Sequence, residues 1–193
     1  MRKFVLRVGC FFAFYVGFYY LWSRVYRFLF ERRYRNRLVG DGIYNLQDLE
    51  IRMSRFCWLT DRMMQLWDAI GEPGRVEAGF DNPEIRKKFG NDCDEAAAYC
   101  ARVLSKKRFN YECVGIMSVV GMDGGHNVCI FNDVSKAIDR QNWYYIGNWY
   151  GGESRGPFHK EESIAFDIGR KLGGLVGWSI ADERLRRRSM RIL

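Results

Sequence analysis

A cysteine and a histidine stand where a thiol nucleophile and its base could meet. Cys93 lies in the segment GNDCDEAAAY (residues 90–99), where a loop leads into a helix. His126 is one of two histidines in the chain and opens the apolar run HNVCIF (126–131). A thiolate activated by a neighbouring imidazole attacks acyl carbons. The two segments therefore predict nucleophilic thiol chemistry, provided that the fold brings them together.

The residues around Cys93 predict a helix over 92–108 that would activate the thiol. Asp92 is a favoured N-cap, and Glu95 three residues later has the spacing of a capping box. Cys93 would then lie in the first turn, where the positive end of the helix dipole lowers the pKa of a thiol, although the acidic neighbours Asp92, Asp94 and Glu95 would work against the thiolate. Its backbone N–H would also be available to an oxyanion. The alternative is a buried structural cysteine, which is the commoner role of a free cysteine.

Three segments that follow this helix predict neighbouring antiparallel strands. They cover 111–121, 127–131 and 142–149, with a turn at 122–125. In the right register, His126 and Asn148 would lie side by side, and Asn148 would orient the imidazole. Asp139, in the loop before the third strand, is the second choice for this orienting group. The alternatives are a turn histidine and a turn asparagine.

These three blocks resemble, in their order, the transglutaminase-like cysteine peptidase family of the papain-like clan. GNDCDEAAAY is similar to the block that opens the nucleophile helix, GHNVCIF (125–131) to the block whose histidine opens a strand, and NWYYIGNW (142–149) to the following strand. The resemblance covers about residues 80–150. It implies Cys93 as the nucleophile, His126 as general base and acid, and Asn148 as the orienting group. The chain carries Asn148 where most relatives carry aspartate.

The fold we expect is α+β and of the papain/transglutaminase-like kind. Helices would come first, the Cys93 helix would pack on an antiparallel sheet of about four strands, and a hydrophobic helix would precede them all. Residues 1–37 are predicted to form that hydrophobic helix and a basic extension, and residues 38–193 the cysteine hydrolase domain.

Other helices and strands are predicted around this centre. An amphipathic helix is expected over 45–70, ended by GEPG at 71–74. A short helix is expected over 82–90, with Asn82 as its cap and Gly90 as its end. After residue 149 we expect a loop, a helix near 161–172 and a last strand at 175–181.

Residues 8–23 form an uncharged, aromatic segment that predicts a membrane anchor. As a helix the segment would be about 24 Å long, against about 30 Å for the hydrocarbon core of a bilayer, and the flanking arginines can extend its reach. The arginines after it are denser than those before it, which by the positive-inside rule places the domain in the cytoplasm. The alternatives are a helix lying along the membrane surface and a helix packed on another protein chain.

The formal net charge of +8 is concentrated at the two ends of the domain. Arginines crowd residues 24–37 and 184–191, and the chain between them is nearly balanced. Basic ends suit anionic lipid or an acidic partner, although they are also common as solvated surface. Nucleic acid is disfavoured as a partner because no recognition motif accompanies the charge.

The cysteines indicate reduced thiols, and no metal or cofactor motif is present. The chain has six cysteines and no Cys-x-x-Cys pair, so a disulfide framework and a zinc site are both disfavoured. A Walker loop and a dinucleotide fingerprint are also missing. The cysteines are Cys10, Cys57, Cys93, Cys100, Cys113 and Cys129.

These observations predict a membrane-anchored cysteine hydrolase (a thiol protease or amidase). It would cleave an amide or isopeptide bond of a protein or peptide substrate, and transfer of the acyl group to an amine is left open. The alternative is a non-catalytic, membrane-associated structural or assembly protein of the same fold. The uncharged Asn148 and the basic ends favour this alternative.

Overall fold

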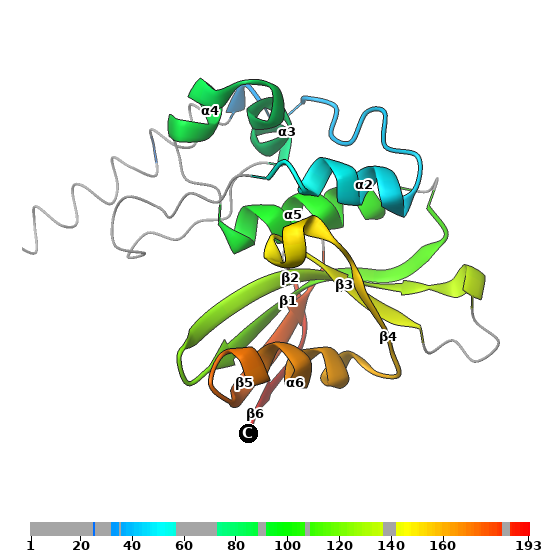
Figure 1. Cartoon of the computed structure of the whole chain (residues 1–193), viewed down its shortest axis with the longest axis vertical. Helices are drawn as coiled ribbons and strands as arrows, with labels where there is room; N and C mark the ends of the chain where they lie inside the picture. Colours follow the sequence, from blue (N-terminus) through cyan, green and yellow to red (C-terminus); the bar gives the residue numbers. More distant parts are fainter. Residues whose placement is uncertain are drawn as a thin grey trace, which may run out of the picture.

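The computed structural model describes residues 25, 32–34, 36–56, 73–88, 92–106, 109–136, 142–182 and 186–193. The chain is a mixed α+β protein built on a six-stranded antiparallel sheet. Figure 1 shows how the helices lie around this sheet. The described helices are α2 (Leu46–Met53), α3 (Pro73–Asp81), α4 (Pro83–Lys88), α5 (Cys93–Leu104) and α6 (Glu161–Lys171), with short 3-10 turns η1 (Val134–Lys136) and η2 (Trp149–Gly152). The strands are β1 (Tyr111–Gly121), β2 (Gly124–Asp133), β3 (Trp143–Ile146), β4 (Arg155–Phe158), β5 (Leu175–Ala181) and β6 (Arg187–Ile192).

The strands lie in the order β4-β3-β2-β1-β5-β6. The three predicted neighbouring strands are therefore confirmed as β3, β2 and β1, and β1 has the predicted bounds. The expectation of about four strands was wrong, because β4 and β6 extend the sheet at its two edges. Both edge strands lack the usual strand signal: β4 contains Gly156 and Pro157, and β6 is rich in arginine.

The sheet separates two hydrophobic cores, one under α5 and one under α6. Along β2, Cys129 and Phe131 belong to the core with α5. Val128 and Ile130 belong to the core with α6. This is the alternation of side chains that a strand requires. It explains why residues 128–131 of β2 are all apolar, since both faces of the strand are covered there.

Two predicted helix boundaries were wrong. The helix expected over 45–70 ends at Met53, and Ser54 is its C-cap, with a hydroxyl that donates to the Ile51 carbonyl; residues 57–72 lie outside the described residues. Pro73, expected in a helix-ending turn, instead begins α3, because proline fits the first turn of a helix.

The remaining elements follow the predictions more closely. The helix expected over 92–108 is present as α5 and ends at Leu104, and the helix near 161–172 is present as α6. The short helix after Asn82 is confirmed as α4, with the Asn82 side chain accepting a hydrogen bond from the Glu84 N–H at 3.0 Å. The strand over 175–181 is confirmed as β5, although β6 follows it.

The predicted anchor at 8–23 and the residue Gly90 lie outside the described residues. No described helix is long and apolar enough to cross a bilayer.

Candidate functional site

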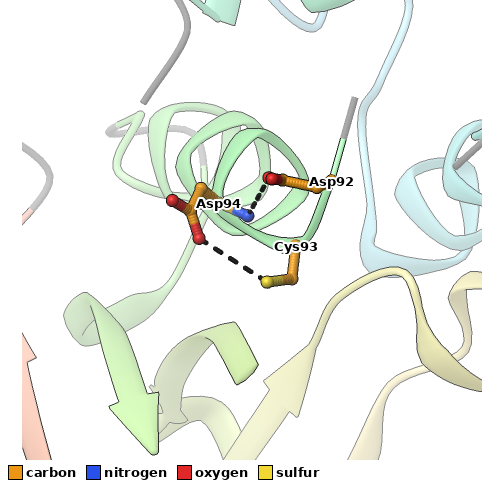
Figure 2. Close-up of side chains that lie close together, drawn as sticks. All are labelled: Asp92, Cys93 and Asp94. Carbon is orange, nitrogen blue, oxygen red and sulfur yellow. Dashed lines mark hydrogen bonds between the residues drawn. The ribbon is translucent and has the colours of Figure 1, made fainter. Parts of the chain in front are cut away.

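The predicted capping box at the start of α5 is confirmed. The Asp92 carboxylate accepts a hydrogen bond from the Asp94 N–H at 2.9 Å, and the Asp92 N–H donates to Glu95 Oε2 at 3.1 Å. Cys93 is the first residue of the helix, as predicted. Figure 2 shows its side chain leaving α5 toward the strands of the sheet, beside the Asp94 carboxylate.

Buried polar contacts hold this end of α5 against α3. The Arg75 guanidinium lies 3.3 Å from Glu95 Oε1, and both side chains are almost completely buried. One helical turn further along, the Tyr99 hydroxyl donates to Glu77 Oε2 at 2.7 Å, and Glu77 also pairs with Arg52 at 3.2 Å. The position of Cys93 is therefore fixed by the α3–α5 interface as well as by its own cap.

The Cys93 thiol is protonated at neutral pH in this arrangement. Burial raises its pKa to about 12, and the Asp94 and Asp92 carboxylates add to the rise. The backbone N–H of Asn127 opposes them, because it donates toward the sulfur and favours the thiolate. The lowering of the thiol pKa that we expected from the helix dipole is outweighed by burial and by the Asp94 and Asp92 carboxylates, whose opposing effect the sequence predicts.

His126 is buried against an aromatic ring. Only 4% of the residue is exposed, and its ring stacks on Trp149 with centroids 3.7 Å apart. Its Nε2 has no hydrogen-bond partner among the described residues. Burial lowers the pKa of His126 to about 4; the Lys171 charge also lowers it, and the Asp92 charge raises it. The imidazole is therefore neutral at physiological pH.

Asn127 links β2 to the cysteine, whereas the neighbouring His126 points to the other face of the strand. Its side-chain amide donates to Asp94 Oδ1, and its backbone N–H faces Cys93 Sγ. Successive side chains of a strand point to opposite faces, so the His126 ring lies on the α6 side, with Trp149. The structure thus brings the thiol to the residue next to His126, while the described contacts include no hydrogen bond between thiol and imidazole.

Asn148 lies just past the end of β3 instead of on the strand. It precedes η2, and both atoms of its side-chain amide are buried without a hydrogen-bond partner among the described residues. No hydrogen bond therefore joins Asn148 to His126 in this structure. Asp139, the second choice for the orienting group, lies outside the described residues.

A stack of aromatic rings and cations, which the sequence did not predict, lies beside His126. The Lys171 Nζ lies 3.6 Å from the centroid of the Tyr150 ring and 5.3 Å from that of Trp149. The Arg155 guanidinium lies 4.1 Å from the Tyr150 centroid. Tyr150 has a left-handed backbone with φ of 56°, a conformation that is rare for a bulky residue. In the sequence, only Gly151 and Gly152 after Tyr150 indicate a tight turn here.

Asp92, Cys93 and Asp94 are close enough together to be considered as metal ligands. Their ligand atoms lie within 4.8 Å of one another. The Asp92 carboxylate already caps α5, and the Asp94 carboxylate already accepts from Asn127. We therefore assign no metal to this cluster. The described cysteines are free thiols: Cys93, Cys100, Cys113 and Cys129.

Comparisons with known proteins give this chain no relative. No family model matches it, and neither the curated proteins nor the solved structures searched include a match.

The buried, neutral His126 predicts a loss of stability in mild acid. Its pKa is about 4 in the folded chain and about 6.5 in an unfolded one. The unfolded state therefore binds more protons between these values, and stability falls as the pH drops through this range. We expect the wild type to lose about 2 kcal/mol more than His126→Gln between pH 7 and pH 4.5. Urea unfolding of both proteins at the two pH values measures this difference, and an equal loss in both would contradict it.

Proposed function

We propose that the chain is a membrane-anchored, transglutaminase-like cysteine hydrolase that cleaves an amide or isopeptide bond. Cys93 is the nucleophile, His126 is its base and acid, and Asn148 orients the imidazole. The observation that carries the proposal is the Asn127 backbone N–H at the Cys93 sulfur, because it puts His126 one residue from the contact. Attachment through residues 8–23, a cytoplasmic domain and contact of the terminal arginines with anionic lipid belong to the proposal and rest on sequence.

The local structure supports a nucleophile at this position. Cys93 opens a capped helix, and its own backbone N–H belongs to the first turn, where helical N–H groups are left for other acceptors. Such an N–H can stabilise the oxyanion of a tetrahedral intermediate. His126 is neutral and its Nε2 has no described partner, so the ring is in the protonation state that a general base needs.

The reaction proceeds in two steps. His126 takes the Cys93 proton as the sulfur attacks the carbonyl carbon, the C–N bond breaks, and His126 returns the proton to the leaving amine. Water then attacks the thioester with His126 as its base, releasing a carboxylic acid and the free thiol. The first step requires the imidazole to leave its stack on Trp149 and turn toward the thiol.

A second candidate is a non-catalytic structural or assembly protein with this fold. One observation favours it specifically: the His126 ring lies on the far side of β2 from the thiol, whose pKa is raised to about 12. In this case the capped helix and Asn127 would have a structural role alone.

Selective alkylation distinguishes the two candidates. The detergent-solubilised full chain is treated near pH 7 with a limiting amount of iodoacetamide, and the labelled cysteines are mapped by mass spectrometry. Cys113 is exposed and Cys93 is only partly so; labelling that follows exposure therefore reaches Cys113 first. The hydrolase predicts that Cys93 reacts about tenfold faster than Cys113, because an imidazole that turns toward the sulfur takes its proton and the thiolate is the reactive form.

The dependence on the histidine is the decisive control. For the hydrolase, His126→Ala abolishes the preference for Cys93, while His159→Ala, which changes an exposed histidine, leaves it intact. Labelling that reaches Cys113 first and is the same in all three proteins rejects the hydrolase and supports the non-catalytic protein.

A further inference from the structure

The sheet face that α5 partly covers continues from Cys93 to the edge of the molecule. Asn127 pairs with Ser118 of β1, and Ser118 pairs with Ser179 of β5. Ser179 in turn pairs with Met190 of β6. A parallel row lies beside this one and consists of Val120, Gly177 and Ile192. We call the two rows together the open strip.

The strand alternation places the open strip on the same face as Cys93. In β1, Ile116 belongs to the core under α5, and Met117 and Val119 belong to the core under α6. Ser118 and Val120 therefore face the α5 side, and their partners on β5 and β6 share that face. Arg191, between Met190 and Ile192, points the other way and pairs with Glu162 of α6, which agrees with this assignment.

The strip is open because α5 packs on β2 and β1 and stops there. Val120, Met190 and Ile192 are 51%, 55% and 72% exposed. Ser118 and Ser179 are half-buried between them. In Figure 1, α5 lies over the middle of the sheet, while β6 leads away to the C-terminus. Next to Cys93, the open strip thus consists of small hydroxyl side chains with apolar side chains beside them.

The dimensions of the strip suit a short extended peptide. Asn127 and Met190 are three strand spacings apart, which is about 14 Å at about 4.8 Å per strand. An extended chain rises about 3.3 Å per residue, so about four residues cover this distance. The serine hydroxyls can donate to or accept from the backbone of such a chain, and Met190 and Ile192 can cover an apolar side chain.

The charges at the two ends of the strip are opposite. Asp92 and Asp94 stand at the Cys93 end. At the far end the Arg187 guanidinium lies 3.5 Å from the Met190 sulfur, which places it on this face. No ion pair joins Arg187 to a carboxylate in the part of the chain that the structure describes. An acidic side chain of the ligand is the group that would complement it.

We propose that the open strip binds the substrate of the Cys93 site, and that this substrate is an extended peptide. An apolar side chain of the peptide packs on Met190 and Ile192. An acidic side chain about four residues from the scissile carbonyl pairs with Arg187. The cleavage of this peptide rests on the proposed function, but its binding does not.

A binding measurement on Cys93→Ser tests the strip without any reaction. The probes are the dye-labelled hexapeptide Ala-Ala-Leu-Ala-Asp-Ala amide and the same peptide with lysine in place of aspartate, followed by fluorescence anisotropy with the full chain. We expect the aspartate peptide to bind about tenfold more tightly, because the exchange turns an attraction into a repulsion. Arg187→Glu is expected to reverse the preference. Arg191→Glu, a change on the opposite face of the same strand, is expected to keep it.

The possible results test peptide binding at the open strip separately from catalysis by Cys93. Equal binding of the two peptides, or a preference that survives Arg187→Glu, overturns the strip as the peptide surface whatever Cys93 does. If the preference for the aspartate peptide changes as expected but iodoacetamide labelling is the same with and without His126, the hydrolase is rejected and the open strip remains a peptide-binding surface. If vesicles of phosphatidylcholine and phosphatidylserine show Arg187-dependent binding and the peptides show none, the occupant is a lipid surface and the peptide proposal is wrong.

Discussion

Replacing Arg75 with methionine is expected to lower the free energy of unfolding by about 2–3 kcal/mol. Arg75 is 1% exposed and its guanidinium faces Glu95 at 3.3 Å. Burial and the Asp92 carboxylate raise the pKa of Glu95 to about 8, and the Arg75 charge opposes this rise. Removing the guanidinium therefore takes from a buried carboxyl both a hydrogen-bond donor and the charge that favours its ionised form. Glu95 also completes the cap of α5, so the loss falls on the helix end that carries Cys93. Urea unfolding followed by circular dichroism at pH 7 measures the difference.

Two variants test this reason for the loss. Arg170→Met removes a guanidinium that pairs with Asp167 at 2.9 Å on the surface. Because the Arg170 side chain is 78% exposed, this substitution should lower the free energy of unfolding by less than about 1 kcal/mol. Adding Glu95→Gln to Arg75→Met replaces the carboxyl by an amide, which needs no opposite charge and keeps an acceptor for the Asp92 N–H, and it should recover part of the stability. If Arg75→Met and Arg170→Met unfold at the same urea concentration, the buried pair does not have the stabilising role assigned here.

The elements predicted best are those whose signals are local. Asp92 and Glu95 at capping-box spacing gave the start of α5 to within one residue, because the cap is formed by residues that are neighbours in sequence. The run of β-branched and apolar residues at 111–121 gave β1 with both ends correct, since Gly121 and the turn after it end the strand. Neither prediction depends on what the segment packs against.

The edge strands depend on a neighbour and were not predictable in the same way. The β6 sequence RRSMRI has arginines on both sides of its single methionine, and it becomes a strand because β5 offers it hydrogen bonds. β4 is short and contains proline, which sheets accept only at an edge, at the start of a strand or at a bulge. Each edge strand forms because a neighbouring strand of the sheet provides its hydrogen-bond partners.

In the candidate site, too, the features with local signals were predictable and those that depend on neighbouring elements were not. That Cys93 begins a helix and comes close to the HNVCIF strand could be predicted, because helix and strand both have local signals. Which of two adjacent residues faces the helix could not, since a shift of one residue in register exchanges the faces of a strand. Asn127, not His126, points to α5 here. The carboxylates that oppose the thiolate are visible in the sequence, but burial, the largest cause of the raised thiol pKa, is not, because it depends on how the sheet encloses the sulfur.

Replacing Gly152 with alanine is expected to lower the free energy of unfolding by about 3 kcal/mol, from left-handed backbone strain and overpacking together. Gly152 has a φ of 87° and lies against the end of α2, where an added Cβ would come within 2.6 Å of the Met53 backbone. The contact matters for the site, because Gly152 ends the turn that begins with Trp149, the ring on which His126 stacks. Two hydrogen bonds from Ser154 to Glu50 hold the same turn on α2.

Gly151 provides a matched control one residue away. Its φ of 65° is also left-handed, but nothing lies within 4 Å of an added Cβ. Gly151→Ala therefore carries the backbone strain alone, about 1 kcal/mol. Urea unfolding of the two variants separates strain from collision with α2. Equal losses in Gly151→Ala and Gly152→Ala would mean that α2 does not press on this turn, and the position of Trp149 against His126 would then need another support.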